Sequence, residues 1–133
     1  MTKSDTPFRY NIERVYFFRV TRAIQEVIMT VTFQENFNEL EVKLQGEIDH
    51  HCARGISESI DFKIKRLRPS LLIMDFGGVS FMDSSGLAIV MGRRKLMTSM
   101  DGSVELRHLC GGPKKVFDMA QISRYVTVKE DEE

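Results

Sequence analysis

The sequence predicts a single α/β domain in which α-helices flank a mixed β-sheet. Apolar runs with strand-like character alternate with segments of helical periodicity from residue 30 onward. The run Leu71–Phe76 is apolar except for Asp75, which is typical of a strand buried on both faces. A short polar turn separates the first two predicted strands, so these two strands are expected to pair antiparallel. A length of 133 residues fits one domain with a sizeable core.

The first 28 residues differ from the rest of the chain. Their apolar residues recur at helical spacing and predict an amphipathic helix that docks on the domain, on a partner or on a second copy. This apolar face comprises Ile12, Val15, Tyr16, Val20, Ala23, Ile24 and Val27. The alternative is that the natural protein starts at Met29 and that the preceding residues are translated upstream sequence. In both cases the domain itself is expected to span residues 29–133.

The domain is expected to begin with two strands, over residues 30–34 and 40–44, and a helix that follows Asp49 as its cap. The apolar stripe of this helix is Ala53, Ile56, Ile60, Ile64 and Leu67. Pro69 ends the helix, because the residue before a proline disfavours helical geometry.

After the central strand, the dipeptide Gly77-Gly78 predicts a turn. The second helix should run from about Ser84 to Ser99. A strand over 104–109, a short helix that starts at Gly111-Gly112-Pro113 and a last strand over 125–128 complete the domain. Residues 129–133 are a solvated acidic tail.

Composition narrows the classes of function. The chain carries 19 basic and 19 acidic residues, so its net charge suggests neither a nucleic acid nor an anionic membrane as partner. Its two cysteines, Cys52 and Cys110, do not make a disulfide framework and favour a reducing compartment. No membrane span or signal peptide is visible. We therefore expect a cytoplasmic protein without a cofactor.

The most informative segment is residues 80–87, Ser-Phe-Met-Asp-Ser-Ser-Gly-Leu, where the central strand gives way to the second helix. Asp83, Ser84 and Ser85 are residue types that favour helix N-caps, and Gly86 is expected to relax the backbone. A serine hydroxyl is thus predicted at the exposed, electropositive end of a helix. Ser85, just inside the helix, is expected to satisfy a backbone group with its side chain.

Three sequence blocks resemble the signature of the STAS domain family, and in particular that of bacterial anti-sigma factor antagonists that regulate sporulation sigma factors. They are Gly-Glu-Ile-Asp-His-His at 46–51, the segment at 80–87, and Val-Phe-Asp-Met at 116–119. The resemblance covers about residues 29–128. The family usually ends in a further amphipathic helix, a pattern that this sequence lacks.

The resemblance implies a function without catalysis. Such a protein binds an anti-sigma factor that is also a serine kinase, and this frees the sigma factor for transcription in sporulation or a stress response. The kinase then uses ATP to phosphorylate the first serine of Asp-Ser-Ser-Gly, which is Ser84 here, and a metal-dependent phosphatase of the PP2C type resets it. Ser85 is the second candidate acceptor. Residues expected to contact the partner are Asp49, His50, Met82, Asp83, Ser84, Ser85 and Gly86. A monomer or weak dimer is expected.

Other interpretations are weaker. The chain could serve as a STAS scaffold or accessory subunit of a larger signalling or transporter-linked assembly. A zinc site could be built from His50 or His51 and Cys52 together with His108 and Cys110. Asp75-Phe76-Gly77 resembles a kinase metal-binding motif but lacks the accompanying loops, and Ser84 lacks the leading glycine of a hydrolase nucleophile elbow.

Overall fold

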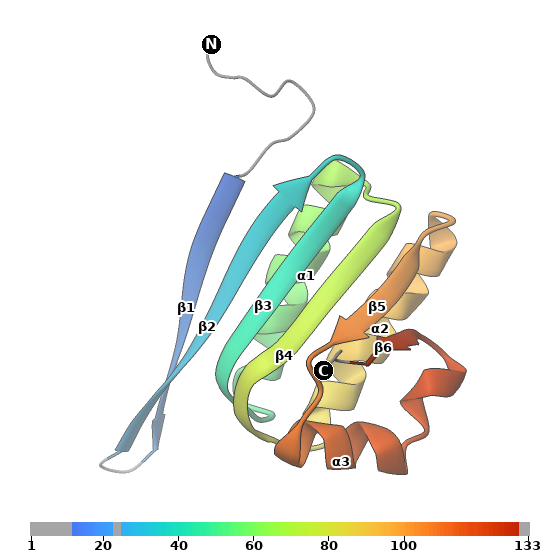
Figure 1. The fold of residues 1–133 in the computed structure, drawn as a ribbon. Helices are drawn as coiled ribbons and strands as arrows, with labels where there is room; N and C mark the ends of the chain where they lie inside the picture. Colours follow the sequence, from blue (N-terminus) through green and yellow to red (C-terminus); the bar gives the residue numbers. More distant parts are fainter. Residues whose placement is uncertain (1–11, 23–24, 131–133) are drawn as a thin grey trace.

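The computed structural model describes the backbone of residues 12–22 and 25–130 and the side chains of residues 29–130. Its elements are β1 (Ile12–Arg22), β2 (Gln25–Asn36), β3 (Glu39–Ile48), α1 (Ala53–Leu67), β4 (Leu71–Met82), α2 (Ser85–Ser99), β5 (Ser103–Arg107), α3 (Gly111–Met119), a 3₁₀ turn η1 (Ile122–Arg124) and β6 (Thr127–Lys129). The strands form one sheet in the order β1-β2-β3-β4-β5-β6 (Figure 1). This confirms the predicted α/β class.

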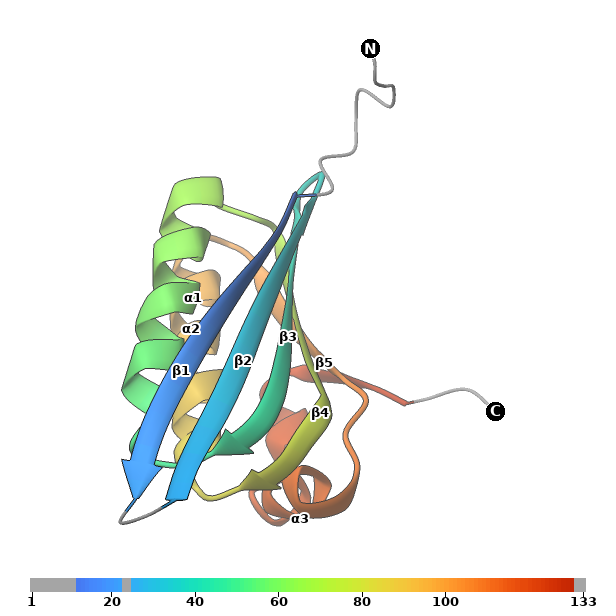
Figure 2. The ribbon, with the colours of Figure 1, turned by 90° about the vertical axis from the view of Figure 1, so that its left-hand side faces the viewer.

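The sheet is mixed. Strands β1, β2 and β3 pair antiparallel, as the sequence predicts for β2 and β3. Strands β3 to β6 pair parallel, with a helical connection between each pair. Helices α1 and α2 lie side by side on one face of the sheet (Figure 2), because right-handed crossovers bring successive helices to the same face. Helix α3 lies at the lower end of β4, apart from that layer.

The core lies between the sheet and the layer of α1 and α2. The predicted stripe of α1 is confirmed at Ile56, Ile60 and Ile64, which are fully buried. Phe76 of β4 makes an edge-on contact with Phe117 of α3, with 5.0 Å between ring centroids. Through this contact, α3 packs against the sheet and contributes to the hydrophobic core.

The amphipathic helix predicted within the first 28 residues is wrong. Residues 12–22 form β1, which pairs along its whole length with β2. Strand β2 itself starts at Gln25, five residues before the predicted strand. The predicted boundary at residue 29 therefore falls inside β2. The alternative that these residues are upstream sequence stays a prediction.

The turn predicted at Gly77-Gly78 is also wrong, because β4 continues through both glycines to Met82. Gly78 pairs with Gln45 of β3 next to a shift in the register. A Cβ atom at Gly78 would lie 2.6 Å from Cγ of Gln45 and 3.2 Å from the carbonyl oxygen of Leu44, so a larger residue there would have to displace the Gln45 side chain. A close approach of two strands, and not a turn, explains this glycine.

The remaining boundaries differ by a few residues. Strand β5 ends at Arg107, and His108 takes a left-handed backbone with φ of 59°. Tyr125 and Val126 precede β6, which follows the 3₁₀ turn η1. Within the described ranges, no helix is long and apolar enough to cross a membrane.

Candidate functional site

Two loops meet at the carboxyl edge of the sheet. Strands β3 and β4 are parallel neighbours and their last residues, Ile48 and Met82, pair with each other. The loop after β3 and the turn after β4 must therefore leave the sheet side by side. The backbone N–H of Asp83 donates to the carbonyl of Ile48 at 3.1 Å and joins the two segments. We call residues 49–51 and 81–86 the Ser84 surface.

Ser84 is the N-cap residue of α2 and is exposed. Its carbonyl accepts the N–H of Leu87 at 3.0 Å, which closes the first turn of the helix. Its hydroxyl makes no hydrogen bond to any described residue. The sequence correctly predicts an exposed serine at the electropositive end of this helix.

The neighbouring hydroxyl, on Ser85, is engaged. It donates to Oδ1 of Asp83 at 2.5 Å, and the backbone N–H of Ser85 donates to the same oxygen at 2.8 Å. The expected hydrogen bond from Ser85 to a backbone group is therefore wrong, since its partner is a carboxylate. The two adjacent serines consequently present very different hydroxyls.

Asp83 is held as a carboxylate by its neighbours. Partial burial pulls its pKa upward, but the side-chain and backbone hydrogen bonds from Ser85 and the proximity of His50 outweigh this effect. The pKa of Asp83 is consequently below its ordinary value. Nδ1 of His50 lies 3.9 Å from Oδ2 of Asp83, a contact that becomes an ion pair when the imidazole is protonated.

Gly86 is required by space. A Cβ atom there would lie 2.3 Å from Sδ and 2.6 Å from Cγ of Met82. Met82 is only 4% exposed, so it has little room to withdraw. The start of α2 therefore packs directly against the end of β4. This contact fixes the position of Ser84 relative to the sheet.

The loop after β3 is organised by Asp49, which the sequence predicts as the cap of α1. The N-cap is instead Cys52. Asp49 is 5% exposed, and its Oδ1 accepts the backbone N–H of His51 at 2.9 Å. The rings of His50 and His51 lie 4.0 Å apart and are both exposed. The buried Asp49 thus holds the backbone of the loop, while the imidazoles of His50 and His51 form its exposed surface.

Of the seven residues predicted to contact a partner, His50 and Ser84 are exposed and Asp83 and Ser85 are partly exposed. Asp49, Met82 and Gly86 are buried and contribute to the shape of the surface from beneath. Phe81, which no sequence pattern marks as a contact residue, is 49% exposed beside the turn. Burial along this end of β4 does not alternate strictly, because Val79 and Met82 are buried and Ser80 and Phe81 between them are exposed, so a simple two-residue period gives no signal for Phe81.

The structure does not support the zinc interpretation. Within the described residues, no three His, Cys, Asp or Glu side chains come together to hold a metal ion. His108 lies beside Asp75 instead, with 3.0 Å between Nδ1 and Oδ2. Asp75 also accepts the N–H of Gly77 at 2.8 Å, a local contact within β4.

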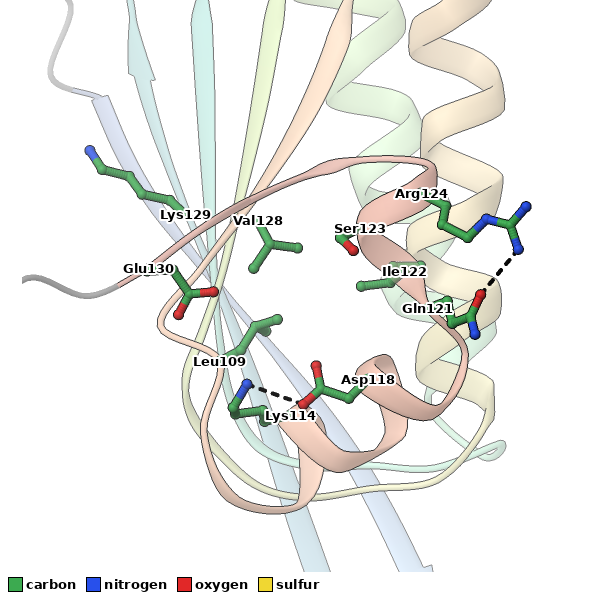
Figure 3. Close-up of a pocket in the computed structure, with 10 residues that line it drawn as sticks. All are labelled: Leu109, Lys114, Asp118, Gln121, Ile122, Ser123, Arg124, Val128, Lys129 and Glu130. Carbon is green, nitrogen blue, oxygen red and sulfur yellow. Dashed lines mark hydrogen bonds and ion pairs between the residues drawn. The ribbon is translucent and has the colours of Figure 1, made fainter.

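A cavity of about 600 Å³ lies elsewhere, between α3, η1 and β6 (Figure 3). Two local contacts join residues of its lining: Nζ of Lys114 lies 3.1 Å from Oδ2 of Asp118, and Arg124 donates to Oε1 of Gln121 at 3.0 Å. The hydrogen bond and charge of Asp118 raise the pKa of Lys114. The cavity contains none of the predicted site residues.

Comparison with known proteins gives consistent relatives. The STAS domain profile matches residues 28–133. The chain is 28% identical over 91 residues to an anti-sigma F factor antagonist of Paenibacillus polymyxa, covering 68% of this chain and 78% of the relative. It is 27% identical over 105 residues to an anti-sigma-B factor antagonist of Bacillus subtilis, covering 79% and 94%.

Solved structures agree with these relatives. The anti-sigma factor antagonist SpoIIAA in its unphosphorylated form superposes with a TM-score of 0.68 at 26% identity, covering 77% of this chain and 89% of that one. The phosphorylated form of the Bacillus cell fate determinant SpoIIAA superposes with a TM-score of 0.62 at 26% identity, covering 77% and 92%.

Proposed function

Because the chain belongs to the STAS domain family, we propose that it acts as an anti-sigma factor antagonist controlled by phosphorylation of Ser84. In the unmodified state it binds an anti-sigma factor that is also a serine kinase, and the sigma factor is released. The kinase then phosphorylates Ser84, and the complex dissociates. The names of the relatives support the antagonist role, and one neighbour has been solved in a phosphorylated form.

The observation that carries the proposal is the state of the Ser84 hydroxyl. It is exposed, lies at the start of α2, and has no hydrogen-bond partner among the described residues. A kinase can therefore reach it without breaking the fold. Two nearby residues of the Ser84 surface, His50 beside Asp83 and Phe81 with 49% exposure, offer further surface for a partner.

Electrostatics explains how one phosphate switches the partner. Phosphorylation adds about −1.5 to −2 charges, next to the carboxylate of Asp83. At a helix N-terminus this charge is tolerated, so the domain stays folded. A partner that presents acidic or apolar groups here is repelled or must desolvate the phosphate. Couplings of this kind are typically about 1–3 kcal/mol, or roughly 5- to 150-fold in affinity.

The test compares Ser84→Asp with Ser84→Ala by calorimetric titration into the anti-sigma factor from the same genome. We expect Ser84→Asp to weaken binding at least about fivefold. Ser84→Ala should bind as the unmodified chain does and stay bound when ATP is added. Ser80→Ala, at an exposed serine near the end of β4, is the matched control and should be released by ATP as the wild type is. Equal binding of wild type and Ser84→Asp contradicts the mechanism.

A phosphatase of the PP2C type removes the phosphate from Ser84, and the cycle takes place in the cytoplasm, where sigma factors meet RNA polymerase. The antagonist itself catalyses neither step. Incubating the phosphorylated chain with such a phosphatase and following the loss of phosphate by mass spectrometry tests the reset.

A second candidate function is that of a subunit in a larger signalling or transporter-linked assembly. It is favoured by β1, an 11-residue strand with β2 as its single neighbour in the described sheet. Long edge strands are templates for pairing with another chain. Light scattering distinguishes the two functions: a monomer favours the simple switch, and an oligomer that is lost when the chain begins at Gln25 favours the assembly.

A further inference from the structure

We propose that Asp83 decides which of the two adjacent serines is phosphorylated, by holding Ser85 and leaving Ser84 free. This role rests on the proposed function. Asp83 is a positioning residue here, because it acts on the choice of acceptor through Ser85. It would make Asp83 the residue that turns an ambiguous Ser-Ser pair into a single switch.

The contacts give the two hydroxyls unequal access. The hydroxyl of Ser85 donates to Oδ1 of Asp83 at 2.5 Å, and its own backbone N–H is bound to the same oxygen at 2.8 Å. To enter a kinase active site, Ser85 must give up a hydrogen bond to a carboxylate, which is stronger than one between neutral groups. Ser84 gives up no comparable bond to a described residue. Ser84 is also the more exposed of the two.

The backbone acts in the same direction. Ser85 is the first residue of α2, and its side chain and main chain are both tied to the turn. The carbonyl of Asp83 in addition accepts the N–H of Gly86 at 3.1 Å. Moving Ser85 out toward a kinase would therefore disrupt the first turn of the helix, whereas Ser84 stands at its outer end.

The contact between Ser85 and Asp83 also suggests the opposite assignment, with Ser85 as the acceptor. A carboxylate that accepts a serine proton could act as a general base and favour attack by Ser85. Asp83 is poorly suited to this role, because the contacts around it lower its pKa and make it a weaker base. The two assignments differ in one measurable quantity, the position of the phosphate.

The chemical step is the same at either serine. The serine oxygen forms a bond to the γ-phosphorus of ATP while the bond from that phosphorus to the β,γ-bridging oxygen breaks. ADP leaves, and the serine proton passes to a base on the kinase or to water. Asp83 takes no part in the phosphoryl transfer itself. It acts before that step, by deciding which serine oxygen is available to the kinase.

The experiment measures the ratio of phosphate on Ser85 to phosphate on Ser84 by fragmentation mass spectrometry. The full-length chain is incubated with ATP and the kinase from the same genome that phosphorylates the wild type. For Asp83→Ala we expect this ratio to rise at least about tenfold. Asp83→Asn keeps an oxygen acceptor without the charge and should give an intermediate ratio. The ratio is insensitive to a general loss of kinase binding, which lowers both signals together.

Two further variants complete the design. Ser80→Ala removes a hydroxyl from the same end of β4 without touching Ser85, and its ratio should equal that of the wild type. In a Ser84→Ala chain only Ser85 is available, and adding Asp83→Ala should speed its phosphorylation at least about tenfold. If Asp83→Ala does not fold, as judged by circular dichroism, the test is the Ser85 to Ser84 phosphate ratio of Asp83→Asn compared with that of the wild type.

The outcomes separate the two proposals. Phosphate on Ser84 in the wild type, with a ratio unchanged in Asp83→Ala and Asp83→Asn, overturns the selection role and leaves the proposed function intact. Phosphate mainly on Ser85 in the wild type overturns both. A wild-type chain that no such kinase phosphorylates overturns the proposed function and the inference that rests on it.

Discussion

Replacing Gly86 by alanine tests whether α2 is seated on Met82. The new Cβ would lie 2.3 Å from Sδ and 2.6 Å from Cγ of Met82, distances at which one side must move. Met82 is 4% exposed and closely surrounded, so the adjustment strains the packing. We expect Gly86→Ala to lower the free energy of unfolding, although alanine is the better helix former.

The expected size follows from two opposing effects. Overpacking a well-packed core costs about 1–3 kcal/mol. Alanine in place of glycine inside a helix contributes up to about 1 kcal/mol in the other direction. With the full gain of about 1 kcal/mol, the net loss in the wild-type background should thus lie between about 0 and 2 kcal/mol. In a Met82→Ala background the clash is gone, and Gly86→Ala should become neutral or stabilising by up to about 1 kcal/mol.

Urea unfolding of the wild type, both single variants and the double variant measures this change of sign as a coupling energy. We expect a coupling of about 1–3 kcal/mol between positions 82 and 86. Met82→Ala alone should lower the free energy of unfolding by about 2–5 kcal/mol. The measurement therefore requires that the double variant is still folded in the absence of urea. An equal effect of Gly86→Ala in both backgrounds would show that the contact with Met82 is not the reason for the glycine.

Three further predictions concern stability and are checked by urea unfolding. Glu35→Gln leaves the buried ammonium of Lys63, which lies 2.7 Å from Glu35, without its counter-charge, and should cost about 3 kcal/mol, whereas the pair Glu35→Met and Lys63→Met together should cost much less. Phe117→Ala removes a fully buried ring that packs on Phe76 and should cost about 3–5 kcal/mol, against a much smaller change for Phe117→Leu. The lowered pKa of Asp83 means that its ionised form stabilises the fold above about pH 4 and that this contribution is lost as the pH falls through the lower, folded value. The stability difference between wild type and Asp83→Ala should therefore shrink on acidification, and a difference that stays constant down to pH 2 would contradict this.

The strand-to-helix turn could be predicted because its signals are contiguous. A buried strand, three capping residues and a periodic helix follow one another between Leu71 and Ser99, and each signal is local. The association of this turn with His50 was accessible only through the family resemblance, since it depends on which strands pair. Parallel pairing of β3 and β4 is a property of the whole sheet, and no local pattern states it.

The N-terminal segment shows why periodicity alone is insufficient. The apolar residues between Ile12 and Val27 fit a helical face, yet residues 12–22 form a strand. The run Val15-Tyr16-Phe17-Phe18 is rich in β-branched and aromatic residues, which favour strands, and that preference carries more weight than the spacing. Pairing with β2 then fixes the extended backbone.

The details of the Ser84 surface depend on which group each polar atom finds. Asp49 has the composition of a helix cap but is buried and bound to the N–H of His51. Ser85 has several possible partners in sequence, and the Asp83 carboxylate is the nearest in space. Such choices are made by distances of a few ångström between competing donors and acceptors, which the order of residues does not encode directly.

The strand order of the sheet has a consequence for biosynthesis. Each strand lies next to the strand that precedes it in the chain, so no strand has to wait for a distant segment to be translated. The ribosome therefore delivers the strands in the order in which they lie in the sheet, and each strand meets a neighbour that is already available. We expect the nascent chain to build β1 through α2 as a growing unit, so that Ser84 is in position before the last strand has left the exit tunnel.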